Sequence, residues 1–312
     1  MNNMRDKPIF NKLFIVILVF FIILKIITLF VQSDLMWDSA VYMGMGKQIY
    51  SLGRVGLWEP SRPLVWPLII GFFWKTGFNF ILSAKILVIL FSFGCAILVY
   101  IIAAKIFDNR VAFYTALFFI FSPTFFIFGG IPVSDVPSLF FLLLSIFYFI
   151  RKKDKLCGCF LGISFMTRFF QIFFIIPILI IYLSLWIRGK IRLKNITNFA
   201  LFFMIPIMPY FLLNVYLYKN PFYPFVLQSF MTKNTGWIFY HPLNYYFINL
   251  FRENFLTLFS ITGVFLIFRK SNFNKTSKIL IFLIPFVLKR KCFICGWSRV
   301  LFIDARRTGE SK

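Results

Sequence analysis

Long apolar runs recur along the chain, separated by short gaps rich in Lys and Arg. The first run covers residues 13–31 and is interrupted only by Lys25. About 20 apolar residues are enough for a helix to cross the hydrocarbon layer of a membrane. Because such a helix satisfies its backbone hydrogen bonds internally, this pattern predicts an all-α fold, a polytopic integral membrane helical bundle.

The composition agrees with lipid as the main solvent of the chain. Hydrophobic residues make up 60% of the sequence and aromatic residues 22%, more apolar surface than a water-soluble fold of this length buries. A net charge of +24 would suggest a nucleic-acid partner in a soluble protein. Here the cations lie between the apolar runs, so we expect contact with membrane lipids and no nucleic acid.

The apolar runs predict one transmembrane domain at residues 1–288, with about nine spans. After residues 13–31, spans are expected at 80–104, 111–130, 136–150, 156–168, 170–187, 198–218, 255–268 and 278–288. Several are short enough to be half-helices. Residues 289–312 are basic and poorly patterned. For them we favour a truncated or frameshifted end over a genuine cytoplasmic tail.

The basic clusters predict the orientation of the chain. Lys and Arg concentrate in alternate connections, which the positive-inside rule places in the cytoplasm together with the N-terminus. The remaining loops, 32–79, 129–135 and 219–254, then face the non-cytoplasmic side of the cell membrane. The clusters are Lys105 and Arg110; Arg151, Lys152, Lys153 and Lys155; Arg188, Lys190, Arg192 and Lys194; and Arg269, Lys270, Lys275 and Lys278.

The first outer loop contains helical apolar spacing. Val41, Met45, Ile49 and Leu52 recur at intervals of three and four residues, which predicts an amphipathic helix lying on the membrane surface. Residues 63–74 are apolar but too short to span, so an interfacial or re-entrant segment is expected there.

Among the ten acids in the chain, Asp38, Glu59 and Asp135 fall in the first two of these outer loops. Ionisable groups near membrane depth are costly and tend to mark substrate chemistry. A carboxylate at this position suits the deprotonation of an incoming hydroxyl or amine. The alternative is that each acid is simply solvated at the membrane surface.

Cations in the same outer loops could bind the phosphate of an anionic lipid. Arg62 and Arg168 are the best candidates, because the planar guanidinium binds two oxygens at once. The competing interpretation is an Arg62–Glu59 ion pair without a catalytic role. Tyr42 and His241 are further outer-face candidates. Arg54, Lys85 and Lys219 are weaker ones, with Lys85 and Lys219 favoured as snorkelling residues.

At these residues the chain resembles the polytopic GT-C glycosyltransferases. The strongest similarity is to the dolichyl-phosphate-mannose–protein mannosyltransferase and aminoarabinose-transferase branch, over roughly residues 10–288. The motifs that carry the resemblance are Trp37-Asp38 with Tyr42, Ser122-Pro123, Ser134-Asp135, Gly162 with Thr167-Arg168, and the run from Tyr218 to Pro224.

The resemblance implies an inverting transfer of a sugar from a polyprenyl-phosphate donor to a protein, lipid or glycan acceptor at the non-cytoplasmic face. It implies Asp38 as the general base and Asp135 as a second active-site acid. Some relatives bind a metal through Asp-x-Asp in the second outer loop, whereas Val133-Ser134-Asp135 offers one carboxylate. Participation of a divalent cation therefore stays open.

Two other functions remain as alternatives. A secondary transporter would carry ionisable groups at mid-membrane and an internal repeat, but no clear repeat is present. A non-catalytic, degenerate lipid-binding membrane protein is the other possibility. Clustering of acids on one side of the membrane favours the transferase over both.

Overall fold

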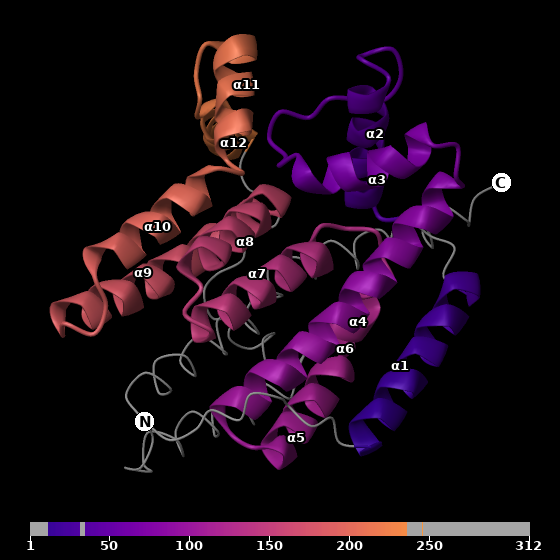
Figure 1. The fold of residues 1–312 in the computed structure, drawn as a ribbon. Helices are drawn as coiled ribbons and strands as arrows, with labels where there is room; N and C mark the ends of the chain where they lie inside the picture. The colour runs from indigo at the N-terminus through magenta and orange to yellow at the C-terminus, as the bar shows by residue number, and fades with distance from the viewer. Residues whose placement is uncertain (1–11, 32–34, 236–244, 246–312) are drawn as a thin grey trace. The chain divides into compact units, whose positions relative to one another are not determined.

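The computed structural model describes residues 12–31, 35–235 and 245. This part of the chain is helical and contains no strand, which confirms the all-α prediction (Figure 1). The helices are α1 (Lys12–Val31), α2 (Trp37–Tyr50), α3 (Val65–Lys75), α4 (Phe80–Ile106), α5 (Asn109–Ile120), α6 (Pro123–Phe128), α7 (Asp135–Ile150), α8 (Asp154–Thr167), the 3₁₀ turn η1 (Phe169–Gln171), α9 (Ile172–Ile187), α10 (Leu193–Met204), α11 (Met208–Tyr218) and α12 (Tyr223–Thr235).

The chain divides into two compact units. The first consists of residues 1–121 and 125–229, and it contains the charged residues of the two sites described below. The second consists of residues 122–124 and 230–312, of which the structure describes 122–124, 230–235 and 245. The predicted spans at 255–268 and 278–288, His241 and the basic tail lie outside the described residues.

Three described helical segments are long and apolar enough to cross a membrane: Lys12–Phe30, Phe80–Ile106 and Phe169–Ile187. A fourth results if α10 and α11 count as one span bent by 46°. The bend lies where Pro206 follows α10, since proline cannot donate the next helical hydrogen bond. The span predicted at 111–130 is likewise divided into α5 and α6, with Pro123 as the first residue of α6. Helices α3, α5 and α7 are shorter apolar helices.

The helix predicted in the first outer loop exists as α2, but its environment differs from the prediction. Val41 and Met45 are buried, and α2 packs against α3. A Cβ atom added to Gly71 would lie 2.8 Å from the Gly46 carbonyl oxygen, so the two backbones approach closely through their glycines. Protein therefore covers the apolar side of α2 at Val41 and Met45, whereas Leu52, beyond the end of the helix, is 89% exposed.

Helices α7 and α8 form the hairpin that positions the site. Helix α7 begins at Asp135, a three-residue turn follows its end, and α8 runs back to Thr167. The two helices pack along their length, and α8 packs against α10 on another side (Figure 1). Because α7 and α8 have similar lengths, 16 and 14 residues, Arg168 returns to the level of Asp135.

Candidate active site

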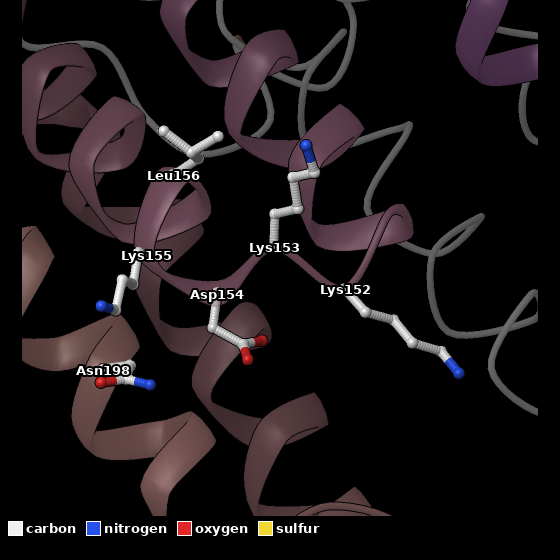
Figure 2. Close-up of a pocket in the computed structure, with 6 residues that line it drawn as sticks. All are labelled: Lys152, Lys153, Asp154, Lys155, Leu156 and Asn198. Carbon is white, nitrogen blue, oxygen red and sulfur yellow. The ribbon is translucent and has the colours of Figure 1, made fainter.

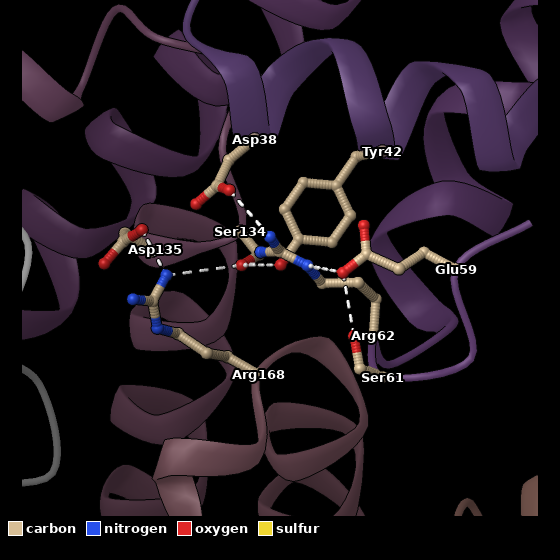
Figure 3. A network of polar contacts seen from close by, with 8 residues as sticks. All are labelled: Asp38, Tyr42, Glu59, Ser61, Arg62, Ser134, Asp135 and Arg168. Atoms are coloured by element: carbon tan, nitrogen blue, oxygen red, sulfur yellow. Dashed lines mark hydrogen bonds and ion pairs between the residues drawn. The ribbon is translucent and has the colours of Figure 1, made fainter. Parts of the chain in front are cut away.

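Four separate segments of the first unit bring charged side chains together (Figure 3). Asp38 lies in the first turn of α2, where the helix dipole favours an acid. Glu59 and Arg62 belong to the connection between α2 and α3, Asp135 opens α7, and Arg168 follows α8. The residues expected to form a site thus converge, although the sequence separates them by as much as 130 positions.

Arg62 contacts two of the carboxylates. Its Nη2 atom donates to Oδ1 of Asp38 at 2.8 Å, and its Nε atom donates to Oε1 of Glu59 at 2.9 Å. The guanidinium also lies 5.4 Å from the centre of the Tyr42 ring. Burial alone would lower the pKa of Arg62, but Tyr42, Asp38 and Glu59 outweigh burial and raise the pKa above its ordinary value. The Arg62–Glu59 ion pair considered from the sequence is present, and Asp38 shares the same cation.

Arg168 holds the other acid. Its Nη1 atom donates to Oδ2 of Asp135, and both side chains are 14% exposed. The same Nη1 atom lies 3.5 Å from Oγ of Ser134, which is 2.9 Å from the Tyr42 hydroxyl. Tyr42 therefore links the two groups, through its hydroxyl to Ser134 and through its ring to the Arg62 guanidinium. Figure 3 shows the hydrogen bonds and ion pairs within each group.

Donors from three helices hold the buried loop that leads into Asp135 and the helix α6 before it. Residues 129–134 are all buried. Lys25 of α1 donates to the Phe126 carbonyl of α6, the helix that precedes this loop, so its side chain faces the bundle. Ser92 of α4 donates to the Gly129 carbonyl at 3.1 Å, and Trp66 of α3 donates to the Pro132 carbonyl at 3.3 Å. These bonds satisfy buried backbone carbonyls and fix the position of the loop.

Helix α11 fixes the segment that carries Glu59 and Arg62. The Tyr210 hydroxyl donates to the carbonyl of Pro60 at 3.1 Å, and Trp58 donates to the Tyr218 hydroxyl at 2.7 Å. Sequence reasoning missed these contacts, as well as the roles of Ser134 and of Ser61, which donates to Glu59 at 2.7 Å. The partners of Trp58 and Tyr210 are 150 or more residues away, and no sequence signal connects them.

The donor set for a metal ion is not assembled in the described part of the chain, where no three His, Cys, Asp or Glu residues gather suitably. The three carboxylates of the network face two guanidinium groups, so the formal charges nearly cancel. Such a site can offer a carboxylate oxygen to a proton and guanidinium N–H groups to an anion.

The weaker cation candidates lie outside this network. Arg54 and Lys219 are exposed, and Lys219 caps α11 in the left-handed conformation, with φ of 57°. Lys85 is only 6% exposed, which does not fit the snorkelling position expected for it.

Residues 61–212 match the model of the family described as dolichyl-phosphate-mannose-protein mannosyltransferase. The matched segment includes Arg62, Asp135 and Arg168, and it begins after Asp38 and Glu59. No curated protein and no solved structure matches the chain significantly.

Proposed function

We propose that this chain is a membrane glycosyltransferase of the GT-C type, which the family match over residues 61–212 supports, and that it transfers a sugar from a polyprenyl-phosphate carrier to an acceptor at the non-cytoplasmic face. The observation that carries this proposal is the network joining Asp38, Arg62, Asp135 and Arg168. The family match favours this function over a transporter or a non-catalytic lipid-binding protein.

In the proposed reaction Asp38 is the general base. Arg62 engages only Oδ1 of Asp38, so Oδ2 is available to the O–H of the acceptor. The acceptor proton passes to Asp38 while the acceptor oxygen attacks the anomeric carbon of the sugar. The bond from that carbon to the carrier phosphate breaks, and its electron pair leaves with the phosphate. Attack opposite the leaving group inverts the configuration of the sugar.

Arg168 and Arg62 are proposed to bind the carrier phosphate. Arg168 contacts Asp135 and Ser134 through Nη1 alone, which leaves Nη2 and Nε for two phosphate oxygens. Arg62 keeps Nη1 for the same purpose while Asp38 and Glu59 hold the other nitrogens.

The test compares cells that lack the gene with cells that express wild-type protein or Asp38→Asn. Mass spectrometry of surface glycans and lipid-linked sugars is the measurement. Loss of a general base should slow transfer roughly 10²–10⁴-fold, so Asp38→Asn cells should accumulate the lipid-linked sugar as deleted cells do.

The matched control is Asp108→Asn, which removes a carboxylate at the N-cap of α5, where asparagine still accepts the bond from the Val111 N–H. Wild-type glycans in Asp38→Asn cells, at equal protein level, would refute the role of Asp38. Asp135→Asn should also impair transfer, because Arg168 loses its counter-charge. Chelator should leave transfer unchanged if Asp135 acts through Arg168 rather than through a cation.

A further inference from the structure

A second group of charges lies at the end of α7 that is remote from the candidate active site. Helix α7 has 16 residues, so its ends are separated by roughly 24 Å along the helix axis. The turn after α7 carries Arg151, Lys152 and Lys153, and α8 then begins with Asp154 and Lys155.

Asp154 ties three helix ends together at this point. Its Oδ1 atom accepts a hydrogen bond from the Tyr182 hydroxyl of α9 at 2.8 Å. Its Oδ2 atom accepts one from Nδ2 of Asn195, in the first turn of α10, at 2.6 Å. Because both carboxylate oxygens are engaged, Asp154 fixes the turn before α8 beside the connection between α9 and α10.

These two connections together form a strongly basic surface, which we call the Asp154 surface. It carries eight cations, and all of them are exposed. None of them takes part in an ion pair with another described residue. The eight are Arg151, Lys152, Lys153, Lys155, Arg188, Lys190, Arg192 and Lys194.

A shallow cavity of about 360 Å³ opens on this surface. Lys152, Lys153 and Lys155 line it with Asn198, and Asp154 is its one acid. Figure 2 shows the three ammonium groups pointing in different directions around Asp154. Cations spread in this way suit several negatively charged groups distributed over a surface better than one small anion held at a point.

Large apolar side chains are exposed beside these cations. Ile187 is 77% exposed and Trp186 44% exposed at the end of α9, and Leu193 is 55% exposed at the start of α10. Tryptophan and aliphatic side chains interleaved with cations are typical of the boundary between headgroups and acyl chains. An acidic protein partner would match the charge of the surface but not these apolar neighbours.

We infer that the Asp154 surface binds the phosphate-bearing headgroups of anionic lipids in the adjacent membrane leaflet. Clusters of cations directly next to a spanning helix attract anionic lipids in this way. This binding is independent of the proposed transfer reaction, since α7 separates the two places. The cations would then hold specific lipids, in addition to orienting the chain in the membrane.

The test uses the full-length chain, purified in detergent and offered equal amounts of phosphatidylglycerol and phosphatidylcholine. Native mass spectrometry then counts the lipids that stay bound. Wild-type protein should retain phosphatidylglycerol preferentially. Each lysine near an anionic surface strengthens attraction roughly fivefold, so the double variant Lys152→Gln/Lys153→Gln should lower the preference roughly 30-fold.

The control variant Lys105→Gln/Arg110→Gln removes two cations at the connection between α4 and α5 and should keep the wild-type preference. Gel filtration confirms that each variant is folded and monodisperse. The proposal is overturned if wild-type protein shows no preference, or if both double variants lose it equally. Retention of a polyglutamate peptide in place of phosphatidylglycerol would assign the surface to an acidic protein and also overturn it.

Discussion

Replacing Gly158 by alanine should disrupt the packing of α8 against α10. A Cβ atom at this position would lie 2.2 Å from the Phe199 carbonyl oxygen. Gly162, one helical turn later, is similarly placed, with its added Cβ 2.4 Å from the Phe203 carbonyl oxygen. Two glycines four residues apart let helix backbones approach closely, a common device in membrane bundles.

The size of the effect follows from what the new methyl group meets. The obstacle is a backbone carbonyl rather than a flexible side-chain end, so α10 must move by about an ångström to restore ordinary contact. Overpacking of a well-packed interior costs about 1–3 kcal/mol, and we expect the upper half of this range. For a chain of 312 residues, the loss corresponds to a fall in Tm of roughly 3–5 °C. The movement should also weaken the 2.6 Å bond between Asn195 and Asp154.

The assay is thermal unfolding followed by tryptophan fluorescence, in one detergent and at one scan rate, because unfolding of such proteins is commonly irreversible. Cys159→Ala, at the neighbouring and half-buried position of α8, is the control and should leave Tm nearly unchanged. Gly162→Ala should resemble Gly158→Ala. If both glycine variants have the same Tm as the wild type, the two helices do not approach as closely as described here.

Three further expectations concern the site and the topology. Arg168→Ala should raise the KM for the lipid-linked donor roughly tenfold or more, since it removes charge-assisted hydrogen bonds; unchanged donor kinetics with less folded protein would make Arg168 purely structural. Trp66→Phe keeps an aromatic ring but leaves a buried carbonyl without its donor, so stability should fall by about 1–3 kcal/mol, measured as a lower Tm than that of wild type. Arg54→Cys should react with an impermeant maleimide in intact cells and Lys152→Cys should not; the reverse result would invert the predicted orientation.

Much of the fold follows from the sequence by local rules. Apolar runs such as residues 13–31 and 80–104 are long enough to dictate helices in lipid, because a backbone in lipid must satisfy its own hydrogen bonds. The hairpin of α7 and α8 was also predictable, since the basic cluster at 151–155 marks the turn between two apolar segments. The order of the predicted outer loops then placed Asp38 and Asp135 on the same side of the membrane.

The broken helices were only partly predictable. Pro123 and Pro206 mark places where a helix cannot continue unchanged, yet the apolar runs around them looked continuous. The bend of 46° between α10 and α11 lies at the break that contains Pro206. The burial of Val41 and Met45 likewise depends on α3, a neighbour that the periodicity of α2 does not reveal.

Sequence alone determined the lipid-embedded helical class, the family resemblance and the candidate acids and cations, because these depend on residue type and local spacing. Tertiary structure decided how the charges are paired. It joined Arg62 to Asp38 and Glu59, and Arg168 to Asp135. It also fixed the Asp135 loop through Ser92 and Trp66, and the preceding helix α6 through Lys25. Such contacts depend on the lengths, bends and packing of whole helices, since a difference of one residue turns a side chain by about 100° around the helix axis.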